Sequence, residues 1–301
     1  MTTVAPASNA VSWQQIDSTG RLLRAQYKAD FGDPFCLMVK TGDNSWLAYS
    51  PGPSLLAAAQ TLISSDAELI LVAPSVGHSM GLTPWLEAFP QAKLTASRRT
   101  ASHLGKKLQL TKFIPVAECQ QGLPDWLQIL ELPDNFFGEC WLRIDGDSSS
   151  SDANTRYWAA CDSLMNLEKL SGKRLMDWLL KLYGLNTGLH FHARFRRSLK
   201  DKLEFREWAL ARLAADQQQV LIPCHGELYS GDDLAIRVTE ILKAKFQTDE
   251  QVTAQLKTGS PFPDYLFVML TTLFMTTLVI TSLVITSLII ITLVENYPGL
   301  D

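Results

Sequence analysis

The sequence lacks the cysteine pattern of a disulfide-bonded or zinc-knot domain. Its 301 residues contain five cysteines, an odd number, and these are widely spaced and form no C-x-x-C pair. A disulfide framework and a structural zinc knot are therefore not expected, and a reducing compartment fits best. The first twenty residues also lack a basic region followed by an apolar run, so no secretory signal is visible.

An excess of positive charge is also absent. The chain holds 27 basic and 31 acidic residues, and only two of the acidic ones lie beyond residue 264, together with none of the basic ones. The first 264 residues therefore carry 27 basic and 29 acidic side chains (31 minus 2), a net charge of −2. Because nucleic-acid binding depends on neutralising phosphates, nucleic acid is not an expected partner.

Three common enzyme motifs are missing as well. The sequence contains no G-x-S-x-G elbow, no phosphate-binding loop and no G-x-G-x-x-G turn. Serine hydrolases, nucleotide hydrolases and dinucleotide-dependent enzymes depend on these motifs, so none of these classes is supported and no organic cofactor is expected.

Apolar runs of strand length alternate with segments of helical spacing along the body of the chain. The continuous apolar run at 69–73 is typical of a strand buried on both faces. We expect strands at 22–27, 35–39, 46–49, 69–73, 92–96, 127–132, 139–144, 157–161 and 220–223, and helices at 55–63, 81–89, 100–107, 198–214 and 233–246. Strands followed by helices, twice over, predict an α/β or α+β sandwich with helices outside.

Three polar side chains lie just past the carboxyl ends of different predicted strands: His78, Asp162 and His225. Ligand sites of α/β folds lie at such strand ends, so we expect the three to converge although they are far apart in sequence. Two imidazoles and one carboxylate would supply three ligands for a divalent metal and leave one position open for water.

Simpler interpretations of these residues stay open at this point. A single histidine after a strand is more often a loop residue that hydrogen-bonds locally. Asp162 precedes Ser163 and Leu164, where a carboxylate is also suited to cap a turn.

The order of the three segments resembles the metallo-β-lactamase fold superfamily, and more closely a branch of it with a degenerate metal-binding motif. The superfamily's first signature is H-x-H-x-D-H after a buried strand. Aligned on its last histidine, His78, the signature has Ala73 and Ser75 at its other two histidine positions. Gly77 stands at the position of the aspartate.

The resemblance implies a fold and a metal site. It implies a four-layer αββα sandwich over residues 21–250, following a disordered segment 1–20. Asp162 matches the metal-bridging aspartate of the superfamily, and His225 matches its last ligand. Because the other donors are replaced, the resemblance implies at most one ion, zinc or another divalent metal, or none if the site is fully degenerate.

The remaining histidines are not expected to bind a metal. His190 and His192 form an H-x-H, which on a strand would place both on one face, but they lie in the wrong segment for the superfamily's first motif. His103 lies on a predicted helix beside two lysines and is expected to be exposed to solvent.

The C-terminal segment 265–294 is 30 residues long and carries no charge. As a helix it would be about 45 Å long, more than the ~30 Å hydrocarbon core of a bilayer. After a linker at 251–264, we expect a single-pass C-terminal membrane helix, with the body in the cytosol because lysines precede the segment and only acids follow it. A buried core helix and a spurious low-complexity end are the alternatives.

Together these features predict a non-hydrolytic binding or scaffold module anchored to a membrane. The alternative is a one-metal metallohydrolase that uses His78, Asp162 and His225. The sequence assigns no catalytic residue and indicates no particular small-molecule or protein partner.

Overall fold

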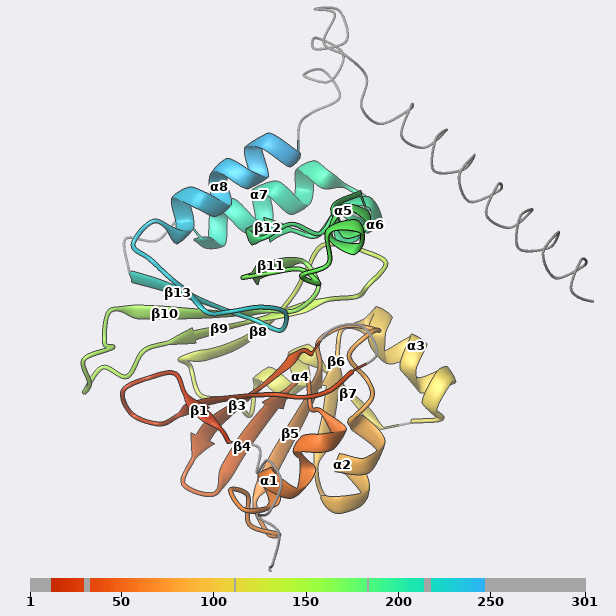
Figure 1. Ribbon diagram of the computed structural model, residues 1–301. Coiled ribbons are helices and arrows are strands. Elements are labelled where there is room, and N and C mark those ends of the chain that lie inside the picture. Colours follow the sequence, from red (N-terminus) through yellow and green to blue (C-terminus); the bar gives the residue numbers. More distant parts are fainter. Residues whose placement is uncertain (1–11, 30–32, 111, 183, 214–217, 247–301) are drawn as a thin grey trace, which may run out of the picture. The chain divides into compact units, whose positions relative to one another are not determined.

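The computed structural model describes residues 12–29, 33–110, 112–182, 184–213 and 218–246 (Figure 1). Within this part, two large sheets pack face to face and helices cover their outer faces. The expected segments 251–264 and 265–294, and residues 1–11, lie outside the described residues. Gln14–Gln15, inside the segment expected to be disordered, pairs with the strand Leu22–Gln26.

The first sheet consists of seven strands in sequence order: β1 (Gln14–Gln15), β2 (Leu22–Gln26), β3 (Phe35–Gly42), β4 (Ser45–Tyr49), β5 (Glu68–Ala73), β6 (Lys93–Ala96) and β7 (Phe113–Pro115). The strands from β1 to β4 are antiparallel, and those from β4 to β7 are parallel. The carboxyl ends of β2, β4, β5 and β6 therefore lie at one edge of this sheet.

The second sheet has the order β14 (Tyr229–Ser230), β13 (Gln218–Pro223), β10 (Thr155–Ala160), β9 (Cys140–Asp145) and β8 (Leu127–Glu131). The central strand β10 is parallel to its neighbour β13. A separate antiparallel pair is formed by β11 (Leu164–Leu167) and β12 (Gly188–Phe191).

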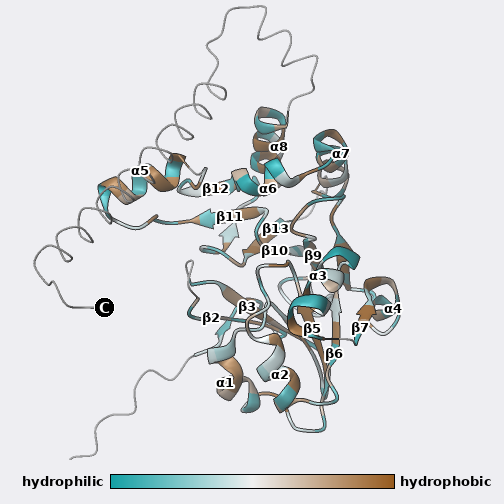
Figure 2. Ribbon diagram, turned by 90° about the vertical axis from the view of Figure 1, so that its right-hand side faces the viewer, coloured by the Kyte–Doolittle hydropathy of each residue, from teal (hydrophilic) through white to brown (hydrophobic). Residues whose placement is uncertain are grey.

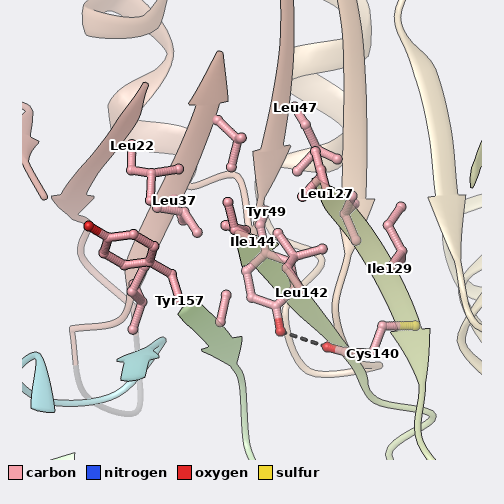
Figure 3. Packing of buried hydrophobic residues seen from close by; sticks show 14 of the residues in the cluster. Leu22, Leu37, Leu47, Tyr49, Leu127, Ile129, Cys140, Leu142, Ile144 and Tyr157 are labelled. Atoms are coloured by element: carbon pink, nitrogen blue, oxygen red, sulfur yellow. Dashed lines mark hydrogen bonds between the residues drawn. The ribbon is translucent and has the colours of Figure 1, made fainter. Parts of the chain in front are cut away.

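The core between the sheets is built by strict alternation of side chains along the strands. In β3, Leu37 and Val39 face the second sheet, while Cys36 and Met38 face the helices outside the first sheet. Figure 3 shows this core, in which the Tyr49 hydroxyl donates a 2.7 Å hydrogen bond to the Cys140 carbonyl. That bond ties β4 of one sheet to β9 of the other.

Two helical layers complete the sandwich, as the turned view in Figure 2 also shows. The first sheet is covered by η1 (Pro53–Leu55), α1 (Leu56–Gln60), α2 (Leu82–Ala88) and α3 (Arg98–Leu108), and the second by α6 (Ala193–Ser198), α7 (Lys202–Leu213) and α8 (Leu234–Lys245). Helix α4 (Val116–Gln120) packs at the edge of the inter-sheet core, and α5 (Arg174–Leu182) follows β11. The predicted αββα arrangement is thus present in the described residues.

The predicted single helix at 198–214 is wrong in its first part. Helix α6 ends at Ser198, and the buried Leu199 is extended and forms a β-bridge with Asn135. A new helix begins after Asp201, whose carboxylate accepts from the backbone N–H groups of Leu203 and Glu204 at 2.8 and 2.9 Å. The tertiary bridge therefore interrupts a segment whose apolar spacing favours one helix.

No helix of the described residues is long and apolar enough to cross a membrane. The segment 265–294 is not among them.

Candidate metal centre

The fold brings His78, Asp162 and His225 to one place. His78 follows β5, and Asp162 and His225 follow the parallel strands β10 and β13 in equivalent positions, because Ala160 and Pro223 are register partners. The predicted convergence of the three residues is therefore present in the structure.

The three side chains point their donor atoms at a common point. The Nε2 atoms of His78 and His225 are 3.1 Å apart. The Oδ1 atom of Asp162 lies 3.4 Å from Nε2 of His78 and 3.6 Å from Nε2 of His225. Ligands ~2.1 Å from one tetrahedral ion are about 3.4 Å apart, so the donor set fits a divalent metal.

Two hydroxyl groups hold the other nitrogen of His78. Ser50 Oγ lies 2.8 Å and the Tyr27 hydroxyl 3.4 Å from Nδ1, and these two oxygens are 2.9 Å apart. Ser50 adopts a left-handed backbone conformation with φ +59°, directly after β4. Partners of this kind fix the orientation of an imidazole and leave Nε2 to face a ligand.

A third hydroxyl orients the carboxylate. Ser75 Oγ donates a 2.5 Å hydrogen bond to Oδ2 of Asp162 and accepts one from the backbone of Gly77 at 3.2 Å. Ser75 is the residue that the sequence alignment placed at a histidine position, and in the structure its hydroxyl supports the Asp162 carboxylate. With Oδ2 engaged, Oδ1 is the oxygen that faces both imidazoles.

Charge pairing dominates the ionisation of this cluster. Burial alone would lower the pKa of His78, but the Asp162 carboxylate outweighs it and raises that pKa to about 9. Burial alone would raise the pKa of Asp162, yet His78 and His225 hold it well below its usual range. These shifts favour a carboxylate paired with an imidazolium, and a metal ion that bound to His78 would displace the proton.

The replaced positions of the signature offer no second set of ligands. Ala73 is fully buried among the apolar side chains between the first sheet and its helices. A Cβ added at Gly77 would lie 3.7 Å from Oδ2 of Asp162, so this position does face the centre but carries no donor. Neither position therefore provides a metal ligand in this chain.

A second group of possible donor atoms shares His78 with the three residues above. His78, Cys161 and Cys224 bring one atom each to within 4.8 Å of one another. Burial raises the pKa of the Cys161 thiol well above its usual range, which disfavours the thiolate that binds metals. This group also shares His78, so it is not an independent site.

The other histidines lie elsewhere. In His190, Nδ1 contacts the Gly188 carbonyl at 2.8 Å and Nε2 accepts from the Asn186 backbone at 3.4 Å, so both nitrogens are engaged. His192 precedes α6, with its backbone N–H bonded to the Ser163 carbonyl. His103 is exposed on α3. None of the three belongs to a cluster of possible metal ligands among the described residues.

Sequence reasoning missed Tyr27, Ser50 and Glu139. Tyr27 and Ser50 come directly after β2 and β4, at the same sheet edge as His78. Glu139 precedes β9, which runs antiparallel to β10. The start of β9 therefore lies beside the end of β10, which Asp162 follows. The carboxyl-end rule that selected His78 also applies to Tyr27 and Ser50, whereas Glu139 could be found only from the antiparallel pairing of β9 with β10.

No family model and no curated protein matches the sequence. Among solved structures, a diflavin flavoprotein fragment from Nostoc sp. PCC 7120 is similar with a TM-score of 0.51 and 16% identity, over 78% of this chain and 97% of that one. A B3 metallo-β-lactamase with an active-site glutamic acid is similar at a TM-score of 0.46 and 12% identity, over 76% of this chain and 88% of that one. A mutant flavo di-iron protein from Thermotoga maritima follows at 0.48 and 10% identity, over 77% of this chain and 61% of that one.

The resemblance predicted from the sequence is confirmed at the level of the fold, which this chain shares with the Nostoc fragment. At identities this low, the similarity carries nothing further about activity.

Proposed function

We propose that this chain of the metallo-β-lactamase fold is a ligand-binding module that holds a single divalent metal ion through His78, Asp162 and His225. The observation that carries the proposal is the set of three distances between donor atoms, 3.1, 3.4 and 3.6 Å. They bracket the ~3.4 Å expected for ligands of one tetrahedral ion.

The surroundings of the triad support the same proposal. Metal ligands are usually oriented by hydrogen bonds to the atoms that do not face the ion. Here Ser50 contacts Nδ1 of His78, and Ser75 donates to Oδ2 of Asp162. All three side chains are at most 16% exposed. This limits access of water and strengthens the attraction between an ion and the carboxylate.

The donor set supports one ion and argues against two-metal hydrolysis. Ala73 and Gly77 provide no ligand, and the Ser75 hydroxyl is already bonded to Asp162. An ion bound with an open position polarises an oxygen ligand or a water molecule. The glycine at 77 leaves no carboxylate to serve as the base, so the proposed role is binding rather than hydrolysis.

Metal analysis tests the proposal directly. The full-length chain loaded with zinc in detergent and passed through a desalting column is expected to retain one ion per chain. His225→Ala is expected to weaken zinc binding by about 100-fold, because one of three protein ligands is lost. His103→Ala removes an exposed imidazole outside the triad and should leave the affinity unchanged.

Two results would contradict this. Retention of two ions per chain would restore the two-metal hydrolase interpretation, and no retained zinc would mean that the site is fully degenerate. Hydrolysis of a simple ester or phosphodiester that disappears in His225→Ala would favour the one-metal hydrolase instead.

We also propose that residues 265–294 anchor the chain to a membrane with the body on the cytosolic side. The support is the absence of charge over 30 residues and the lysines at 243, 245 and 257 that precede them.

Carbonate extraction of membranes tests the anchor. The wild-type chain is expected to stay in the pellet, and a chain without 265–294 is expected to appear in the supernatant. The full-length variant Val284→Arg/Ile289→Arg should also be extracted, since each arginine costs about 3 kcal/mol near a bilayer centre. Equal extraction of all three chains would exclude the anchor.

A further inference from the structure

One face of α3 forms the wall of a cavity of about 860 Å³. The side chains it contributes come from positions i, i+1, i+4, i+5, i+8 and i+9, which share one side of a helix. All six are polar: Arg98, Arg99, Ser102, His103, Lys106 and Lys107. Arg98 and Lys106 are eight residues apart, so the cationic groups are spread over about 12 Å.

The opposite wall is the segment between β8 and β9, and it fixes one of the guanidinium groups. Arg99 Nε donates to the Phe136 carbonyl at 2.8 Å, and its guanidinium carbon lies 4.9 Å from the centre of the Phe136 ring. One nitrogen is thereby engaged, while the other donors of the guanidinium are left for a ligand.

The cavity has an excess of positive charge in a chain whose net charge is −4. Four basic side chains line it against two acidic ones, Glu131 and Asp134. Asp134 is paired with Lys200 at 3.5 Å, and among the described residues Glu131 accepts a hydrogen bond from the Arg98 backbone alone. Within the described part of the chain, the side chains of Arg98, Lys106 and Lys107 form no ion pair.

The loop after β5 contributes one residue to the cavity and one to the candidate metal centre. Val76 lines the cavity and lies between Ser75 and His78 in the loop after β5, and its N–H donates to the Phe137 carbonyl at 3.0 Å. Ala73 and Ala96 are register partners at the ends of the parallel strands β5 and β6. Ser75 and Arg98 therefore leave neighbouring strands at the same edge.

We propose that the cavity binds a small molecule carrying at least two phosphate groups. This assigns a ligand class to the binding module proposed above and rests on that proposal. Guanidinium forks and ammonium groups along one helix face match the several oxyanions of two or more phosphates better than a single charge. The volume lies in the range of about 300–1,000 Å³ usual for small-molecule sites.

Inorganic pyrophosphate is a suitable probe, measured by titration calorimetry on the full-length chain in detergent, both with zinc and with a chelator present. Saturable binding is expected, and Lys106→Gln/Lys107→Gln should weaken it about tenfold or more because two charge-assisted contacts are lost. Lys243→Gln/Lys245→Gln changes the net charge equally on exposed α8 positions and should leave the dissociation constant nearly unchanged.

Binding that survives the chelator and responds to Lys106 and Lys107 supports the cavity even if the metal site fails its own test. The proposal is overturned if pyrophosphate does not saturate, or if both double variants weaken binding alike. Citrate binding as tightly as pyrophosphate would overturn the assignment to phosphate.

Discussion

Replacing Gly226 with alanine is expected to lower the free energy of unfolding by about 4 kcal/mol. Gly226 has a φ of +99°, a conformation that costs an alanine about 1–2 kcal/mol. A Cβ there would lie 2.0 Å from the Asn166 carbonyl oxygen and 2.4 Å from its carbon, so the backbones must separate. That separation would break the bonds from Asn166 N–H to the His225 carbonyl and from Glu227 N–H to the Asn166 carbonyl, worth about 1 kcal/mol each.

Gly188→Ala is the matched control, because Gly188 has a φ of +77° but nothing within 4 Å of an added Cβ. Chemical denaturation should show a loss of only about 1–2 kcal/mol for the control. Equal losses would mean that the close approach of Asn166 to Gly226 is not present in solution. Since His225 is the neighbour of Gly226, the alanine variant should also bind zinc more weakly than the control.

The strand pattern of the sequence predicted the central part of the fold well, for a physical reason. Strands buried on both faces, such as β5, leave continuous apolar runs that need no partner to be identified. Polar side chains just past such runs stand out, and this selected His78, Asp162 and His225, which the structure brings together. Their role as metal ligands stays a prediction.

The missed parts depend on contacts between distant residues. Strand β7 has only three residues, and β12 with β11 forms a small pair that a local pattern does not reveal. The partnership of Ser75 with Asp162 spans 87 positions, and that of Ser50 with His78 spans 28. A sequence shows that Ser75 is no histidine, but only the fold shows what its hydroxyl does instead.

A buried carboxyl group behind the metal centre provides the second large effect. Oε1 of Glu139 accepts hydrogen bonds from Trp141 Nε1, the Cys161 backbone and Ser163 Oγ at 3.0, 2.9 and 2.6 Å. Among the described residues, Oε2 has no partner. Burying an ionised carboxylate that has one oxygen without a hydrogen bond costs free energy, so the neutral form of the Glu139 side chain is favoured. Burial first, and then the charge of Asp162, raises the pKa of Glu139 to about 8.

Because the folded pKa of Glu139 lies above its ordinary value of 4.5, the folded chain keeps a proton that the unfolded chain loses between these pH values. The stabilisation from Glu139 is therefore complete below pH 4.5 and is lost as the pH rises through 8, a change of about 5 kcal/mol. Glu139→Gln keeps the acceptor oxygen but cannot titrate, so the stability of the wild type relative to this variant should fall by about 3.5 kcal/mol between pH 5 and pH 8. Urea denaturation of both chains at pH 5, 6, 7 and 8 with a chelator present measures it. The loss of stability from His78, whose pKa is also raised, is nearly the same in both chains, because Asp162 and not Glu139 supplies the main charge that raises this pKa. A difference that stays constant over this range would show that Glu139 is already ionised in the folded chain and that a solvent or protein donor satisfies Oε2.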